Sequence, residues 1–208
     1  MADLAVKTVV FDFFGVICPN LAALTGAEFS LRHGISPVEF SRFGHTHREA
    51  LDAGQMSQLQ FATLLQKQWH VNIEPAALCD ELDALDGHYY AFDHRLHDLI
   101  KVIKPQAAVA VMSNVSRDEG AYLRSLGAYD AFDSVFLSGD ARLTKSDPAW
   151  FNQVADSLVC LPGEVMLIDD CMGNVTSARA AGWSSSYWYQ TPVLLAAYLA
   201  QLGFNTEK

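Results

Sequence analysis

Polar side chains that could do chemistry follow four short apolar runs in this sequence of 208 residues. Continuous apolar runs of this length are typical of strands that are covered on both faces. Ligands bind at the carboxyl ends of parallel strands, so we expect the polar residues that follow the runs to meet at one edge of a sheet. These residues are Asp12, Ser113, Asn114, Lys145, Asp169, Asp170 and Asn174.

This set of side chains is chemically coherent for phosphoryl transfer. Its carboxylates would repel one another unless a cation lies among them, and oxygen ligands without histidine favour Mg²⁺. A carboxylate can attack phosphorus and form an aspartyl-phosphate, while a lysine and Mg²⁺ neutralise the charge of the phosphoryl group. Taken singly, each residue has a simpler reading: the acidic pair as a helix N-cap, the Ser-Asn pair as a turn, and the lysine as a solvated side chain.

The elements that must position these residues read as an open parallel α/β sheet. Helix starts are marked between the apolar runs: Asp147 and Thr191 each precede a proline suited to the first helical position, and Ser116 begins a capping box. Because the last four apolar runs alternate with helices, the fold class is α/β with a parallel sheet. The predicted strands cover residues 9–13, 107–112, 135–137, 165–168 and 185–189.

About eighty residues separate the first two predicted strands, far more than one crossover helix requires. Within this stretch Ser36 and Ser57 each begin a capping box, and Phe61, Leu65 and Trp69 recur at helical spacing, which indicates core packing. We therefore expect a small helical domain inserted after the first strand. The predicted domains are a core of residues 1–16 and 99–208 and an insertion of residues 17–98.

The composition excludes several classes of partner. The chain has 14 Lys and Arg residues against 24 Asp and Glu, a formal net charge of −10 that repels nucleic acid and anionic lipid. No run has the length of a membrane-spanning helix, and the first apolar run lacks a secretory pattern. The four cysteines are scattered, which favours a reduced, cytoplasmic setting. Nothing in the sequence indicates an oligomeric state.

Four segments, in order, resemble the four motifs of the haloacid dehalogenase (HAD) superfamily, and together they span nearly the whole chain. They are residues 9–17 (VVFDFFGVI), 111–114 (VMSN), 145–151 (KSDPAWF) and 167–183, which begins Leu-Ile-Asp-Asp. The fourth is the most specific. The resemblance implies a Rossmann-like core, and the position of the insertion matches the helical cap of the subfamily whose cap follows strand one.

The resemblance also implies a role for each matching residue. Asp12 would be the nucleophile and a ligand of Mg²⁺, with the backbone carbonyl of Phe14 as a further ligand. Lys145 would pair with Asp12 and with the phosphate of a small phosphorylated substrate, over which the cap would close. The remaining implied roles are metal binding by Asp169 and Asp170, phosphate binding by Gly15, Ser113 and Asn114, and support of the acidic loop by Asn174.

The sequence departs from the family pattern at Phe14. Family phosphatases usually carry a second aspartate at this position, which protonates the leaving oxygen and later activates water. A phenylalanine side chain cannot transfer a proton, and the loss of a positioned acid–base group typically costs about 10²–10⁴-fold in rate. A phosphatase would then need a substrate with a good leaving group, or another acid from the cap. The sequence offers His45, His47, Asp83 and Asp86 there and selects none of them.

Two other functions remain open at this point. Enzymes of the 2-haloacid dehalogenase type also lack the second aspartate and use no metal, but their fourth motif lacks the adjacent acidic pair, and they have a tyrosine where this chain has Phe151. Asp169 beside Asp170 is costly without a cation, which disfavours this function. Alternatively, the chain is a weak or inactive member that binds a phosphorylated ligand or a protein partner.

Overall fold

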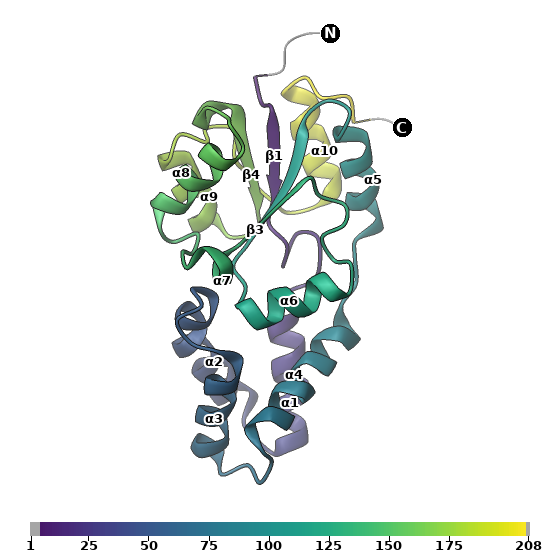
Figure 1. Ribbon diagram of the computed structural model, residues 1–208. Coiled ribbons are helices and arrows are strands. Elements are labelled where there is room, and N and C mark those ends of the chain that lie inside the picture. The colour runs from purple at the N-terminus through teal and green to yellow at the C-terminus, as the bar shows by residue number, and fades with distance from the viewer. Residues whose placement is uncertain (1–4, 207–208) are drawn as a thin grey trace.

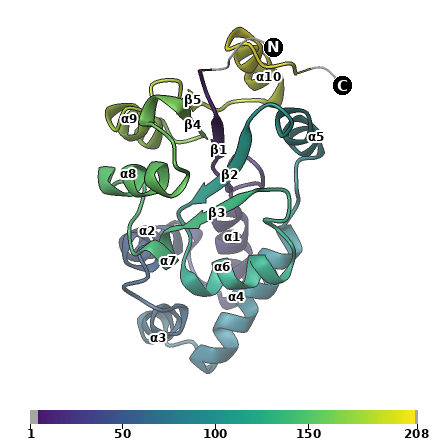
Figure 2. The same cartoon turned by 45° about the horizontal axis from the view of Figure 1, so that its top comes forward.

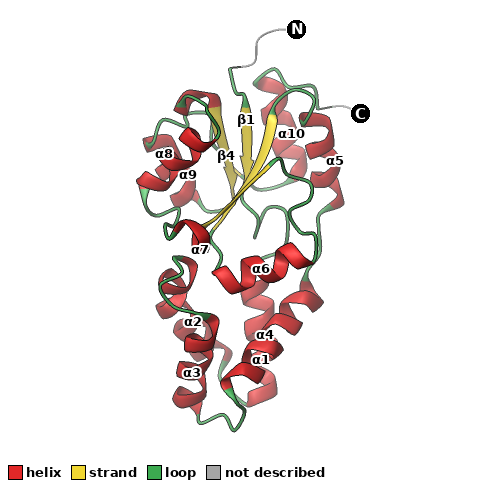
Figure 3. Cartoon of the chain, in the orientation of Figure 1, coloured by secondary structure: helices red, strands yellow, loops and turns green. Residues whose placement is uncertain are grey.

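The structure, a computed structural model, describes residues 5–206 and shows a sheet flanked by helices above a second group of helices (Figures 1 and 3). In chain order the elements are β1 (Thr8–Phe11), α1 (Leu21–His33), α2 (Pro37–Asp52), α3 (Gln58–Trp69), α4 (Pro75–Tyr89), α5 (His94–Ile103), β2 (Ala108–Ser113), α6 (Arg117–Ser125), β3 (Ser134–Leu137), α7 (Ser138–Ala141), α8 (Pro148–Ser157), the 3₁₀ turn Pro162–Glu164, β4 (Val165–Asp169), α9 (Met172–Ala180), β5 (Tyr187–Trp188) and α10 (Pro192–Gln201).

The five strands of the described chain form one sheet in the order β3-β2-β1-β4-β5, and every neighbouring pair is parallel. This confirms the predicted α/β class, with a strand in each of the five predicted places. In the register of the sheet, Phe11 of β1 pairs with Val111 of β2 and Ile168 of β4. Asp12, which follows β1, and Asp169, the last residue of β4, therefore lie at the same level at the carboxyl end of the sheet.

Both faces of the sheet are covered, which explains the continuous apolar runs. Helices α8 and α9 lie on one side of the sheet, and α5 and α10 on the other (Figures 1 and 2). Alternate side chains of β1 point to opposite faces of the sheet. Val10 belongs to the apolar cluster that contains Trp150 and Trp183, whereas Val9 and Phe11 belong to the apolar cluster on the other face. With its two faces buried, the sheet can present polar groups only at its ends.

The helix starts that the sequence marked are present. The Asp147 side chain accepts a hydrogen bond from the backbone N–H of Ala149, and Pro148 follows it in the first turn of α8. Ser57 and Gln60 form a reciprocal capping box at the start of α3. Local side-chain chemistry thus fixes where these helices begin, and with them the loops at the end of the sheet.

Helices α1 to α4 form a separate bundle below the carboxyl ends of the strands (Figure 1). The bundle has its own apolar core, in which Phe29, Leu65 and Leu78 are fully buried. The predicted boundary of the insertion at residue 98 lies inside α5, and α5 packs Leu96 and Ile100 into the core of the sheet. No helix within residues 5–206 is both long and apolar enough to cross a bilayer.

Candidate active site

The end of the sheet holds a buried lysine between two carboxylates. Lys145 Nζ lies 2.7 Å from Oδ1 of Asp12 and 2.7 Å from Oδ2 of Asp169. Lys145 and Asp169 are fully buried, and Asp12 is 8% exposed. Buried charges of this kind are stable only when they are paired, so the three side chains fix one another's positions.

The loop after β4 orients Asp169 through neutral donors. Asn174 Nδ2 donates to both carboxylate oxygens, at 3.0 and 3.1 Å, and the backbone N–H of Cys171 donates to Oδ1 at 2.8 Å. The side chain of Asn174, in the first turn of α9, therefore closes the loop that carries the acidic pair. This is the place in the fold that the sequence predicted for Asn174.

Asp12, Asp169 and Asp170 offer carboxylate oxygens that all lie within 4.8 Å of one another. Asp170 is more exposed than the other two, and its carboxylate lies against Gly15. A Cβ on Gly15 would come within 2.1 Å of Asp170 Oδ2, and the backbone of Gly15 has φ +83°, which side chains rarely tolerate. The loop after β1 thus leaves room for the Asp170 carboxylate beside Asp12, and these hard oxygen donors fit Mg²⁺.

The charges of the site are unbalanced without a cation. Burial raises the pKa of Asp12 well above its usual range; Lys145 offsets this in part, while Asp169 and Asp170 add to the rise. Burial and then the charge of Asp169 also raise the pKa of Asp170. Burial alone would lower the pKa of Lys145, but its two carboxylate neighbours outweigh burial and raise it. A divalent cation would reverse the local sign and favour the ionised carboxylates.

Ser113 is the last residue of β2, and Asn114 follows it beside this centre. The hydroxyl of Ser113 is fully buried and has no hydrogen-bond partner in the described part of the chain, so its hydrogen-bonding capacity is unsatisfied. The side-chain oxygen of Asn114 accepts from the backbone N–H of Lys145 at 3.0 Å and so holds the lysine loop. Gly15, predicted to bind phosphate, instead donates its N–H to the carbonyl of Cys18 at 2.7 Å. Its part in the site is the space it leaves for Asp170.

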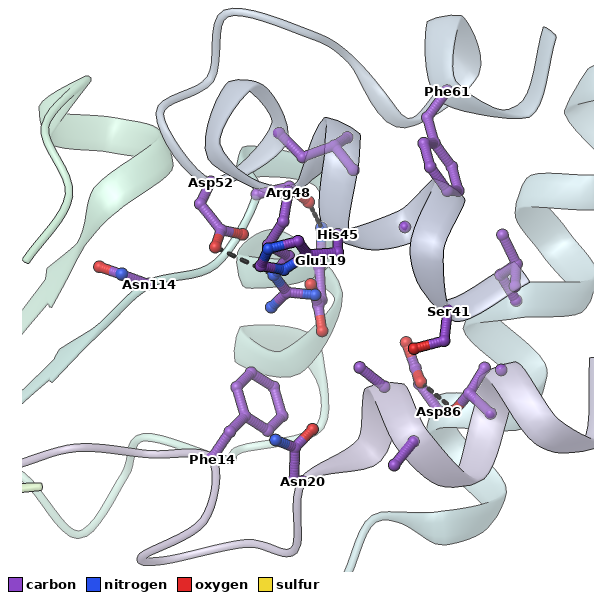
Figure 4. A pocket seen from close by; sticks show the side chains of 18 of the residues that line it. Phe14, Asn20, Ser41, His45, Arg48, Asp52, Phe61, Asp86, Asn114 and Glu119 are labelled. Carbon is purple, nitrogen blue, oxygen red and sulfur yellow. Dashed lines mark hydrogen bonds and ion pairs between the residues drawn. The ribbon is translucent and has the colours of Figure 1, made fainter. Parts of the chain in front are cut away.

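A cavity of about 670 Å³ lies between the sheet and the helical bundle, and Asp12, Asn114, Lys145 and Asp170 line it. The Phe14 ring points into this cavity (Figure 4). Because a phenyl ring cannot transfer a proton, residue 14 supplies no acid–base group to the cavity. The volume is that of a small-molecule site, and most of its wall is apolar.

The cavity wall opposite the sheet carries charged residues that the sequence did not single out (Figure 4). They are Arg48 and Asp52 from α2 of the bundle and Glu119 from α6. Burial raises the pKa of Glu119 to about 7, with Arg48 acting in the opposite direction. Of the predicted cap candidates, His45 and Asp86 line the cavity. His47 and Asp83 do not line it, and Asp83 accepts a hydrogen bond from Gln58.

A family model of the haloacid dehalogenase-like hydrolases matches residues 6–182. The chain belongs to this family. The match covers β1 through α9 and hence every residue of the candidate site. The HAD resemblance in the sequence is therefore confirmed, and with it the hydrolase class.

Solved structures of HAD proteins have the same fold. A HAD family enzyme from Bacteroides thetaiotaomicron, solved with magnesium and inorganic phosphate, has a TM-score of 0.73 and 18% identity over 89% of this chain and 94% of that chain. A 2-haloacid dehalogenase from Pseudomonas syringae has a TM-score of 0.68 and 19% identity over 94% of this chain and 99% of that chain. At these identities the likeness shows the fold alone.

One curated relative is more similar in sequence but only over a segment. A drimenol cyclase from Aspergillus calidoustus is 34% identical over 80 residues, which is 38% of this chain and 15% of the cyclase. The chain thus matches a small part of that larger protein.

Proposed function

We propose that the protein is a Mg²⁺-dependent phosphomonoester hydrolase that forms an aspartyl-phosphate on Asp12. One observation carries this proposal: a carboxylate that is paired with a buried lysine has an oxygen within 4.8 Å of oxygens of two further carboxylates, beside the cavity between the sheet and the bundle. That arrangement suits a nucleophile, a cation site and a positive group for a phosphoryl oxygen in one place. The substrate class is a small phosphorylated metabolite of the cytoplasm.

Each side chain then has a distinct task. Asp12 attacks the phosphorus through one carboxylate oxygen, while Lys145 holds the other oxygen and neutralises charge on the phosphoryl group. The hydroxyl of Ser113 and the side-chain amide nitrogen of Asn114 donate to phosphoryl oxygens. Asp12, Asp170 and the carbonyl of Phe14 would hold Mg²⁺, with Asp169 beside them. When bound, the ion supplies positive charge that stabilises the phosphoryl oxygens.

Phosphomonoester hydrolysis also needs a proton for the leaving oxygen. Phe14 cannot give one, so the sheet end alone provides a nucleophile, a cation site and phosphate donors but no acid–base group of the usual kind. Substrates whose leaving group is a weak base tolerate this lack best. An aryl phosphate with a good leaving group is therefore the right first substrate for a test.

The test is hydrolysis of 4-nitrophenyl phosphate by the purified protein with and without Mg²⁺, followed by a panel of sugar phosphates and acyl phosphates. We expect Mg²⁺-dependent release of nitrophenol, and we expect Asp12→Asn to abolish it. Absence of turnover across the whole panel would contradict the phosphatase function. Chloride release from a 2-chloro acid without metal would instead identify a dehalogenase, a reaction for which the aromatic residue at position 14 is suited.

A further inference from the structure

The last turn of α2 is anchored to the loop that carries Lys145. Glu49 Oε1 accepts a hydrogen bond from the Thr144 hydroxyl at 2.8 Å and from the Ser146 hydroxyl at 3.0 Å. These two residues flank Lys145 in the sequence. Just beyond the helix, a Cβ on Gly54 would lie 2.8 Å from the Gly139 carbonyl oxygen, so the two backbones meet closely. The end of α2 thus has a fixed place at the sheet end.

This anchoring presents Asp52, one turn after Glu49, to the cavity. Asp52 is 5% exposed and lines the same cavity as Asp12 and Lys145. Its Oδ2 accepts from Arg48 Nε at 2.9 Å, and Figure 4 shows the carboxyl group directed into the pocket. Its Oδ1 is buried and has no partner among the described residues. A buried polar atom left without a partner is costly, which points to a group of a bound ligand as its partner.

The surroundings of Asp52 favour its protonated form. Burial raises its pKa, and Glu49 adds to the rise, whereas Arg48 and Lys145 act in the opposite direction. Glu119, from α6, also faces it and interacts with it electrostatically. The influence of Lys145 places Asp52 within electrostatic reach of the catalytic lysine. A raised pKa increases the share of Asp52 that carries a proton, which suits a group that donates one.

The other acids of the cavity are less suited to this task. Asp86 already accepts a hydrogen bond from the Thr25 hydroxyl. After burial, the largest influences on the pKa of Glu119 come from Arg48 and from acids of the bundle. Asp52 alone among them combines a free oxygen, burial and an electrostatic link to Lys145.

We propose that Asp52 is the proton donor and acceptor of the reaction, in place of the residue that Phe14 cannot provide. This inference rests on the proposed phosphatase function. In the first step Asp12 forms a bond to phosphorus, the bond from phosphorus to the leaving oxygen breaks, and the Asp52 proton passes to that oxygen, giving an alcohol. In the second step Asp52 takes a proton from water, whose oxygen attacks phosphorus. The bond to Asp12 then breaks, inorganic phosphate leaves, and both side chains are restored.

The experiment compares Asp52→Asn with the wild-type enzyme on phosphate esters whose leaving groups differ in basicity: 4-nitrophenyl, phenyl and alkyl phosphate. We expect kcat/KM for the alkyl phosphate to fall by about 10²–10⁴-fold, and kcat/KM for 4-nitrophenyl phosphate to change little. In the variant kcat for 4-nitrophenyl phosphate should fall, after a burst of nitrophenol, because water attack then limits turnover. In the wild type, kcat/KM for the alkyl phosphate should decline as pH rises and Asp52 loses its proton, and Asp52→Asn should remove this decline.

Asp83→Asn is the matched control, because Asp83 is a half-buried cap aspartate whose pKa is also raised by burial but which does not line the cavity. An equal loss for all three esters in Asp52→Asn, or the same selective loss in Asp83→Asn, overturns the inference. Should Asp52→Asn fail to fold, the same comparison of esters is made with Asp52→Glu. A carboxyl displaced by about 1 Å costs on the order of 10²-fold, so an unchanged ratio between alkyl and 4-nitrophenyl phosphate overturns the inference.

The outcomes also separate this inference from the function on which it rests. If the wild type hydrolyses the esters, Asp12→Asn is inactive and Asp52→Asn keeps the wild-type leaving-group dependence, the phosphatase function stands and the role of Asp52 is overturned. If the wild type hydrolyses none of the esters, both are overturned.

Discussion

Gly15 offers a direct test of the metal site, because the atoms nearest to a methyl group added there belong to the carboxylate of Asp170. In Gly15→Ala the new Cβ would lie 2.1 Å from Asp170 Oδ2, whereas ordinary contact begins near 3.4 Å. Asp170 must therefore move by about 1.3 Å. Mg²⁺ accepts oxygen ligands only near 2.0–2.1 Å in a nearly ideal octahedron, so a shift of this size removes Asp170 from the coordination sphere.

We expect Gly15→Ala to weaken Mg²⁺ binding by at least about 10-fold, since even outer-sphere changes at metal sites typically cost about 10–100-fold. The substitution also places alanine in the left-handed region, which costs about 1–2 kcal/mol of folding free energy. Gly34→Ala is the matched control. Gly34 has φ +65°, and no atom lies within 4 Å of the position of its Cβ, so this variant has the backbone strain without the clash.

Calorimetric titration of each protein with Mg²⁺ measures the affinity, and urea unfolding measures the folding free energy. The two variants should lose similar stability, but only Gly15→Ala should lose Mg²⁺ affinity and Mg²⁺-dependent activity. Wild-type Mg²⁺ affinity in Gly15→Ala would refute the assignment of Asp170 as a metal ligand. An equal loss of Mg²⁺ affinity in Gly34→Ala would refute the local explanation.

Two further predictions concern stability. Lys145→Met leaves Asp12 and Asp169 buried without their partner, so urea unfolding without metal should show a loss of about 3–5 kcal/mol; unchanged stability would mean that the lysine is not paired. The pKa of Glu119 rises from 4.5 to about 7 on folding, so the folded state binds more protons and loses stability as pH rises between these values. Wild type should thus become less stable than Glu119→Gln by on the order of 3 kcal/mol at pH 8, and a difference independent of pH would contradict this.

The proximity of Asp12 and Asp169 could be predicted from the sequence, because both residues stand at the carboxyl ends of neighbouring strands. Asp12 and Asp169 each follow an apolar run, and the parallel register then brings them to the same height without any knowledge of side-chain packing. The position of Lys145 is harder to predict in this way, because the short helix α7 separates this residue from the end of β3. Its position depends on the hydrogen bond between its backbone and Asn114, which the sequence does not reveal.

Asp52 could not have been found in the same way. In the sequence it reads as the last residue of an amphipathic helix with a partner four residues earlier, a pattern usual on solvated surfaces. Its place in the cavity follows from how the insertion docks on the sheet, through Glu49 and the close approach of Gly54 to Gly139. Such contacts between distant segments have no periodic signal. For the same reason His47 and Asp83, as plausible as Asp86 in the sequence, lie away from the cavity wall.

The phenylalanine at position 14 and the buried carboxyl group of Asp52 are linked in the proposed mechanism, because Asp52 supplies the acid–base group that Phe14 lacks. With an aspartate at position 14, the sheet end would hold every reacting group, and the bundle would need only to shape the cavity. With phenylalanine there, an aromatic ring points into the cavity, and the other acids that line the cavity away from the metal site are Asp52 and Asp86 of the bundle and Glu119 of α6. In the proposed mechanism the proton comes from Asp52, and a loosely docked bundle could not hold this residue in a fixed position relative to Lys145. Glu49 accepts hydrogen bonds from the residues on either side of Lys145 and so gives the bundle that fixed position, and the proposed proton transfer therefore requires the bundle to be docked.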